Sequence, residues 1–212
     1  MRTLISVLMM LAASIPARGD DIAGRFDYYA LSLSWSPNWC ALEGDARRSP
    51  QCDEDTGYGW ILHGLWPQYT HGWPQDCDSD FPAPSGSVLS SITDIMPSQA
   101  LARHQWQKHG TCDGRPPTDY FAAAREAFEG IAKPPSLRQH GATIMISALE
   151  IEAAFLKENQ TLFPEALTVT CRRGAIQEVR ICLNRETLSP RRCTGSVAQD
   201  CVLPDALLAP VR

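Results

Sequence analysis

The chain has 212 residues, of which 44% are hydrophobic and 20% are charged. This length fits one domain of ordinary size, and the apolar fraction excludes wholesale disorder. The net charge of −5, from 19 Lys and Arg against 24 Asp and Glu, argues against a generally basic surface that binds nucleic acid non-specifically. Eight cysteines and 16 prolines indicate disulfides and long ordered loops.

Residues 1–19 have the pattern of a secretory signal peptide. Arg2 supplies the positive start, an apolar stretch covers residues 4–15, and small residues follow at the positions that a signal peptidase reads. A membrane anchor needs about 20 apolar residues, more than this stretch offers. We therefore expect a secreted or periplasmic protein without a membrane partner, whose residues 20–212 form one domain.

The elements predicted after the leader mix strands and helices. Residues 26–35 alternate apolar and small polar side chains, as a half-buried strand does, and residues 58–66 form a strand-like run that Pro67 ends. A Pro-rich loop then leads to a short helix over residues 88–95. The remaining elements are helices over residues 99–109, 118–132 and 147–158 and strands over 167–171 and 175–183, with a tight turn at Arg173-Gly174. The pattern predicts one α+β domain.

All eight cysteines lie beyond the leader, and none forms a C-x-x-C pair. A zinc ribbon or a redox dithiol is therefore a poor interpretation, and four disulfides formed in an oxidising compartment is a better one. Spacing alone does not choose among the 105 pairings that eight cysteines allow.

His63 lies in the apolar run Ile-Leu-His-Gly-Leu-Trp-Pro of residues 61–67. A histidine on an apolar strand is more often a core residue than a catalyst. The neighbouring Gly64 weakens that interpretation, because it lets another backbone or a ligand approach closely.

A second cluster runs from His104 to Cys112 and reads His-Gln-Trp-Gln-Lys-His-Gly-Thr-Cys. On a helix, Lys108 lies about 40° and His109 about 140° around the axis from His104. Gln105 falls between them, whereas Trp106 faces the opposite side and is free to pack into the core. Two imidazoles, an ammonium and an amide therefore project from one flank.

Two kinds of chemistry suit these groups. A zinc site would use His63, His104 and His109, but no H-E-x-x-H spacing is present and Lys108 would repel a cation. Phosphoryl transfer fits better, because an imidazole pair works as base and acid near neutral pH and a lysine offsets charge on phosphate oxygens. RNA carries its own nucleophile in the 2′-hydroxyl, so neither a metal nor a protein nucleophile is needed.

Both segments resemble the two active-site signatures of the ribonuclease T2 family, which are secreted acid ribonucleases. H-G-L-W-P is matched without change by residues 63–67, and H-E-W-x-K-H-G-T-C by residues 104–112 except at Gln105. The Trp35-Ser36-Pro37 segment before Cys40 and the segment 178–182 also resemble the family. The resemblance implies a central antiparallel sheet flanked by helices and stapled by disulfides.

The family's spacing also implies a disulfide pattern. It pairs Cys40 with Cys52, Cys77 with Cys112, Cys171 with Cys201 and Cys182 with Cys193. Each bridge would stabilise the fold by about 2–4 kcal/mol by restricting the unfolded chain. The second bridge would tie the loop after the first signature to the end of the catalytic helix.

The activity implied by the resemblance is cleavage of single-stranded RNA with low base specificity and through a 2′,3′-cyclic phosphate. His109 would act as the base and His63 as the acid, while His104 holds the phosphate and Lys108 stabilises the transition state. RNA is the expected partner; DNA, metal and cofactor have no part in this scheme, and the chain is expected to be a monomer.

Gln105 departs from the family pattern. Its amide can donate a hydrogen bond to a phosphoryl oxygen, but it carries no charge and accepts no proton. The alternative hypothesis is therefore a catalytically weak RNA-binding or signalling protein on the same scaffold.

Trp66 is a candidate for base stacking, with a core position as the competing interpretation. Gln68, Tyr69 and Trp73 are weaker candidates for contacts with bases. His71 and His140 have no predicted chemical role.

Overall fold

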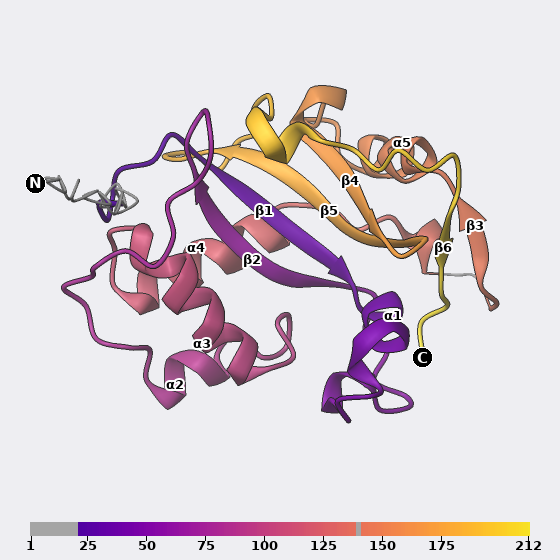
Figure 1. Ribbon diagram of the computed structural model, residues 1–212, viewed down its shortest axis with the longest axis horizontal. Helices are drawn as coiled ribbons and strands as arrows, with labels where there is room; N and C mark the ends of the chain where they lie inside the picture. The colour runs from indigo at the N-terminus through magenta and orange to yellow at the C-terminus, as the bar shows by residue number, and fades with distance from the viewer. Residues whose placement is uncertain (1–20, 139–140) are drawn as a thin grey trace, which may run out of the picture.

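The computed structural model describes residues 21–138 and 141–212 (Figure 1). The predicted leader, residues 1–19, and His140 lie outside the described residues. The strands are β1 (Tyr28–Trp35), β2 (Trp60–Gln68), β3 (Ile144–Ile146), β4 (Leu167–Arg172), β5 (Ala175–Asn184) and β6 (Ala206–Leu208). The α-helices are α1 (Ser36–Trp39), α2 (Gly86–Ser90), α3 (Gln99–Lys108), α4 (Pro117–Glu129) and α5 (Ala148–Glu158). Short 3-10 or π-helical turns cover 40–44, 50–52, 110–112, 135–137, 164–166 and 195–198.

In the described part of the chain, the strands form one six-stranded sheet in the order β2-β1-β5-β6-β3, and β4 pairs with β5 outside this path. All pairings are antiparallel except a single parallel pair, Ala175 with Leu207, between β5 and β6. The helices α2, α3 and α4 lie beside the β1–β2 end of the sheet, and α5 packs on β4 (Figure 1). The α+β class and the helix-flanked sheet are therefore confirmed, with one parallel contact added.

The strand β1 is buried on both faces rather than half-buried. Tyr29, Leu31 and Leu33 enter the main core with the helices. Tyr28 and Ala30 point to the opposite face, where they pack with Val197 of the C-terminal segment in a second, smaller cluster. The prediction of a half-buried strand was wrong because the C-terminal segment packs on the second face of β1. Ser32 is fully buried as well.

The strand β2 continues through Pro67 to Gln68, two residues beyond the predicted end. Because β2 is an edge strand, the missing N–H of Pro67 breaks no ladder hydrogen bond on its open side. The strand therefore keeps Trp66, Pro67 and Gln68 in register with β1.

The helices α2 and α4 begin near their predicted positions but end earlier, whereas α5 ends at Glu158 as predicted. The helix α2 ends at Ser90, and residues 91–95 continue as turns that still bury Leu89 and Ile92. The helix α4 stops at Glu129, with Gly130 as its C-cap, instead of reaching residue 132. The start of α5 is fixed by a capping box between Ser147 and Glu150.

The predicted hairpin forms between β4 and β5. Arg173 and Gly174 both have positive φ, 52° and 79°, as a two-residue turn that matches strand twist requires. Among the described residues, no helix is long and apolar enough to cross a membrane.

The four disulfides join Cys40 to Cys52, Cys77 to Cys112, Cys171 to Cys201 and Cys182 to Cys193. These are the pairs that the family resemblance implies. The closed segments span 12, 35, 30 and 11 residues. Two of the bridges hold the long loops on either side of β2, which is the strand that carries His63.

Candidate active site

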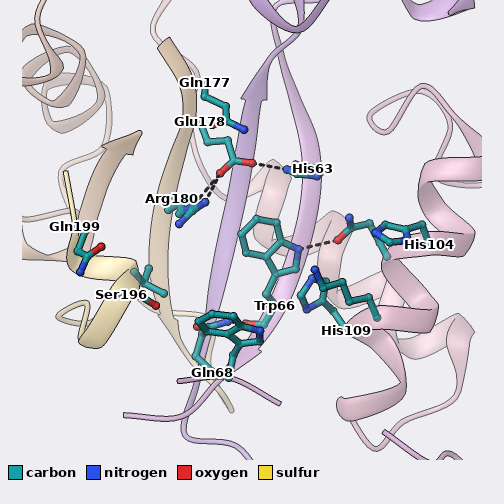
Figure 2. Close-up of a pocket in the computed structure, with 14 residues that line it drawn as sticks. His63, Trp66, Gln68, His104, His109, Gln177, Glu178, Arg180, Ser196 and Gln199 are labelled. Carbon is teal, nitrogen blue, oxygen red and sulfur yellow. Dashed lines mark hydrogen bonds and ion pairs between the residues drawn. The ribbon is translucent and has the colours of Figure 1, made fainter. Parts of the chain in front are cut away.

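The two sequence signatures meet in one cavity of about 520 Å³ between β2, α3, β5 and the C-terminal segment (Figure 2). The sequence-predicted residues that line this catalytic cavity are His63, Trp66, Gln68, Trp73, His104, Gln105, Lys108 and His109. Tyr69 does not line it, and its hydroxyl donates instead to Asp21. His71 is exposed and lies outside the lining.

His63 reaches the cavity because β2 is irregular at this residue. In the pairing with β1, Gly64 lies opposite Ser32 and Leu62 opposite Leu33, so His63 is the extra residue of a β-bulge. A bulge re-aims the side chain of the extra residue and is frequent beside active sites. His63 therefore leaves the apolar alternation of its strand, which removes the core-residue interpretation.

Glu178 and Arg180 of β5 hold the His63 ring in place. The Nδ1 atom of His63 lies 2.5 Å from Glu178 Oε1, and Arg180 donates to the other carboxylate oxygen at 2.7 Å from NH2 and 2.9 Å from Nε (Figure 2). Glu178 is only 1% exposed. Burial alone would raise its pKa, but His63 and Arg180 outweigh burial and lower the pKa to about 2. The carboxylate therefore stays charged in neutral and mildly acidic solution.

The His109 imidazole has the opposite environment. It follows the last residue of α3, is 7% exposed, and its Nδ1 atom is buried without a hydrogen-bond partner in the described part of the chain. Burial first, and then the positive charges of Lys108, His63 and His104, lower the pKa of His109 to about 3. The ring is therefore neutral at ordinary pH and has a lone pair available.

Trp66 separates the two imidazoles. Its indole meets the His63 ring edge-on, with centroids 5.2 Å apart, and stacks on the His109 ring at 5.2 Å and 29°. Its Nε1 donates to Gln105 Oε1 at 2.7 Å (Figure 2). Because one face of the indole covers His109, that face is closed to a nucleobase. Trp66 therefore contacts the imidazole rings of both His63 and His109.

Gly64 makes this arrangement possible. A Cβ atom at residue 64 would lie 2.3 Å from Trp66 Nε1 and 2.4 Å from Gln105 Oε1. Any other residue would push apart the hydrogen-bonded pair, so the close approach inferred from Gly64 is to these two side chains.

The Lys108 and His104 side chains occupy the same flank of α3. His104 is exposed and Lys108 is half-buried, and both line the catalytic cavity. Neither side chain has a hydrogen bond or an ion pair within the described ranges, so their donors are available to a ligand. Both side chains line the same cavity as His63 and His109.

The loop after β2 holds the C-terminal end of α3 in place. Cys112 is bonded to Cys77, and the backbone N–H of Asp76 donates to Lys108 O at 2.9 Å. At Gly110 a Cβ atom would lie 2.5 Å from the buried Trp106 ring, so the chain turns where only glycine fits. The loop after β2 therefore anchors the residues that carry Lys108 and His109.

Sequence reasoning missed Glu178 and Arg180 as site residues. The sequence places both residues only within the segment 178–182 that resembles the family. A usable signal was present, because a glutamate in the middle of the apolar run of residues 175–183 needs a partner when it is buried. Which partner it finds depends on the bulge at His63, and that bulge is not visible in the sequence.

No group of three His, Cys, Asp or Glu side chains in residues 21–138 and 141–212 lies so that it could hold a metal ion. His63, His104 and His109, the ligands of the alternative zinc site, line one cavity but are not arranged to bind a metal ion together.

The fold is shared with RNA-cleaving enzymes of known structure. Trichomaglin, described as an S-like ribonuclease, superposes with a TM-score of 0.67 over 89% of this chain and 100% of its own, at 20% identity. RNase NT, solved in complex with 5′-AMP, superposes with a TM-score of 0.64 over 89% of this chain and 100% of its own, at 22% identity. The chain therefore has the α+β fold of these ribonucleases.

The sequence comparison assigns the family. The ribonuclease T2 family model matches residues 26–193. A ribonuclease of Aeromonas hydrophila is 32% identical over 223 aligned positions that cover all of both chains. The chain belongs to the ribonuclease T2 family, whose members are RNA-cleaving endoribonucleases.

Proposed function

We propose that the protein cleaves single-stranded RNA by transphosphorylation, without a metal. The observation that carries this proposal is the pair of imidazoles in opposite environments, one against a buried carboxylate and one buried with a depressed pKa. Neutral His109 takes the proton of the 2′-hydroxyl, whose oxygen attacks the adjacent phosphorus. Protonated His63 gives its proton to the departing 5′-oxygen, and a 2′,3′-cyclic phosphate remains.

The surrounding side chains support this division of roles. Glu178 accepts from Nδ1 of His63 and stabilises the positive ring that an acid needs. Lys108 and His104 offset the charge that grows on the phosphate oxygens. Water then opens the cyclic phosphate with the roles of the two histidines reversed. Trp73, which is 45% exposed, and the part of Trp66 that lines the catalytic cavity provide aromatic surface for bases.

The pH dependence follows from the sign of the pKa shift at His109. A pKa of about 3 keeps this base neutral in mildly acidic solution, so acid does not disable it until the pH approaches that value. The proposed mechanism also needs a protonated acid, so we expect the rate to fall on the alkaline side. We expect a bell-shaped profile of kcat/KM that peaks below neutrality, with substantial activity at about pH 4.

The test is one assay series on purified protein. RNA and DNA of matched sequence are incubated with and without EDTA between about pH 3 and pH 8. RNA cleavage that survives EDTA and is highest in acid supports the proposal. Cleavage of DNA, loss of activity in EDTA, or an optimum in alkali would contradict it.

Gln105 tests the alternative of a catalytically weak protein. Its Oε1 already accepts from Trp66, and a glutamate would keep that bond while adding a negative charge close to His109 and Lys108. Because the amide already orients Trp66, we expect Gln105→Glu to change kcat by less than about tenfold. Steady-state kinetics on RNA gives the answer, and a gain of a hundredfold or more would show that the natural protein is impaired.

We also propose that the protein works outside the cytoplasm. Four disulfides persist in an oxidising compartment, and this agrees with the predicted leader. The test is to express the full chain and to determine where the protein accumulates and which residue forms its N-terminus. Export together with loss of the predicted leader supports this proposal, and retention in the cytoplasm with an intact leader contradicts it.

A further inference from the structure

A second cavity of about 520 Å³ lies on the other side of His63. It shares His63, Gln177 and Glu178 with the catalytic cavity, so the two are neighbours across one catalytic side chain. Its remaining walls come from the start of α3 and from the segment between α1 and the 50–52 turn. We call it the arginine cavity, because Arg47, Arg48 and Arg172 line it.

The charges in the arginine cavity are unequal. Glu43 is ion-paired with Arg47 at 2.6 Å and with Arg172 at 2.5 Å. Glu178, on the shared wall, already faces His63 and Arg180. Arg48 has no carboxylate partner among the described residues. Three guanidinium groups of this cavity therefore share the single carboxylate of Glu43, in a chain whose net charge is −5.

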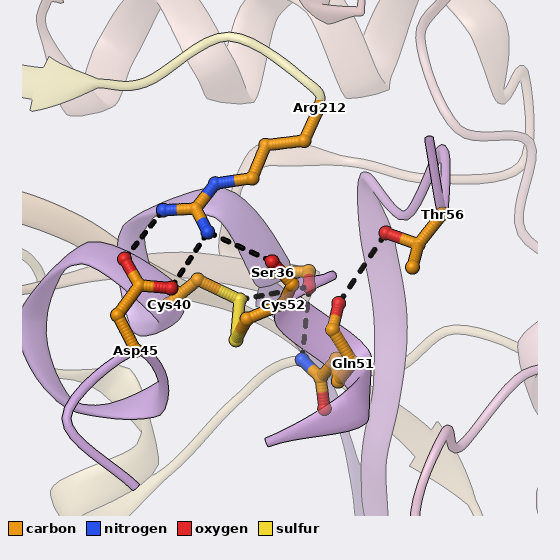
Figure 3. The surroundings of a disulfide bond; sticks show 7 residues. All are labelled: Ser36, Cys40, Asp45, Gln51, Cys52, Thr56 and Arg212. Carbon is orange, nitrogen blue, oxygen red and sulfur yellow. Dashed lines mark hydrogen bonds and ion pairs between the residues drawn. A yellow bond between two sulfur atoms is a disulfide. The ribbon is translucent and has the colours of Figure 1, made fainter. Parts of the chain in front are cut away.

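The segment that carries these arginines is fixed rather than loose. The Cys40–Cys52 disulfide (Figure 3) closes a loop, and this loop contains Glu43, Arg47 and Arg48 in the sequence. From the end of the chain, Arg212 donates to both carboxylate oxygens of Asp45 at 2.6 Å and to the backbone carbonyl of Cys52 at 2.9 Å.

Arg48 also has an unusual backbone. Its φ of 50° lies in the left-handed region, where asparagine or glycine is less costly than arginine. Residues held in this region cluster at functional sites. An arginine at a backbone position that favours glycine or asparagine therefore suggests a functional role, and we consider the Arg48 side chain a candidate for binding an anion.

The direction of the RNA follows from the proposed function, on which this inference rests. If His63 protonates the departing 5′-oxygen, the RNA that begins with that oxygen lies on the His63 side of the scissile phosphorus. The arginine cavity is on that side. Each guanidinium has five N–H donors, so the bonds to Glu43 leave others for a phosphate.

We propose that Arg48, with Arg47 and Arg172, binds a backbone phosphate of the RNA beyond the nucleoside that is released. This phosphate site would favour chains over dinucleotides as substrates. It would also let a net acidic protein hold RNA by a few placed charges.

The test compares two substrates that differ by one phosphate: cytidylyl-3′,5′-adenosine and the same compound with a 3′-terminal phosphate. For the natural protein we expect the added phosphate to raise kcat/KM about fivefold, as a partly exposed charge pair does. The ratio of kcat/KM with the added phosphate to kcat/KM without it is expected to fall toward one in two variants. The first is Arg48→Asn, because asparagine tolerates the positive φ at this residue. The second is the triple variant Arg47→Gln, Arg48→Asn, Arg172→Gln. The glutamines keep hydrogen bonds to Glu43.

The matched control is Arg192→Ala. Arg192 lines neither cavity and is 68% exposed in its side chain, and its loss changes the net charge by the same amount as Arg48→Asn does. The ratio should stay at its natural value in this variant. A natural ratio of one, or an equal loss of the ratio in Arg192→Ala, would overturn the inference.

A binding measurement separates this inference from the proposed function. The 2′-O-methyl forms of both compounds have no nucleophile, so their dissociation constants report binding alone. If the natural protein cuts neither substrate but still prefers the phosphorylated analogue through Arg48, the phosphate site stands and the catalytic proposal fails. If it cuts both substrates and binds both analogues equally, the catalytic proposal stands and the phosphate site fails.

Discussion

Alanine at residue 63 or at residue 109 is expected to lower kcat for RNA cleavage about a thousandfold, within the range of a lost general acid or base. His109→Ala removes the neutral ring that takes the 2′-hydroxyl proton. His63→Ala removes the proton donor to the 5′-oxygen and leaves Glu178 paired with Arg180 alone. Initial rates on RNA, measured with enough enzyme to detect slow turnover, give the size of each loss.

His71→Ala is the matched control for these two variants. His71 is exposed and does not line the catalytic cavity, so its loss should leave kcat unchanged. Thermal unfolding of all three variants shows whether the fold survives. Rates close to those of the natural protein in both His63→Ala and His109→Ala would end the proposed mechanism.

Glu178→Gln is expected to lower kcat by about ten- to a hundredfold, as the loss of a side chain that orients a catalytic group does. Glutamine keeps the shape of the side chain and an oxygen that accepts from His63 Nδ1, but not the charge that stabilises the protonated ring. The alkaline limb of the kcat/KM profile should therefore move to lower pH, while KM changes little. A profile with its natural shape would show that Glu178 acts only in packing.

The same variant has a stability signature with a defined pH window. The folded protein lowers the Glu178 pKa from 4.5 to about 2, so its charge stabilises the fold above about pH 4.5, and this contribution disappears as the pH falls toward 2. We expect Glu178→Gln to unfold more easily than the natural protein at neutral pH, with a difference that narrows in acid. Glu165→Gln, at a 50% exposed side chain, is the control and should show neither effect.

Local patterns in the sequence were enough to predict the catalytic helix and the main strands. In the structure Ser98 caps α3, and the rotation per residue places His104 and Lys108 on one flank with Trp106 in the core, as predicted. The hairpin at Arg173-Gly174 follows from turn chemistry alone. These features depend on residues close together in the chain, so periodicity and caps reveal them.

Features that depend on distant residues were not predictable in this way. The strands β3 and β6 have three residues each, too few for a periodic signal. The bulge at His63 depends on its register with β1, and the partner of Glu178 depends on that bulge. The stacking of Trp66 on His109 requires a strand and a helix to meet, although their residue types alone suggested aromatic and acid–base roles.

The central claim, that two histidines cut RNA through its own 2′-hydroxyl, is tested most directly by the ends of the first products. An RNA oligonucleotide is cleaved briefly in EDTA, and the fragments are identified by mass spectrometry. We predict a 2′,3′-cyclic phosphate on one fragment and a 5′-hydroxyl on the other, with no cleavage at a 2′-O-methyl residue. A 5′-phosphate end, or cleavage at the 2′-O-methyl residue, would contradict the mechanism.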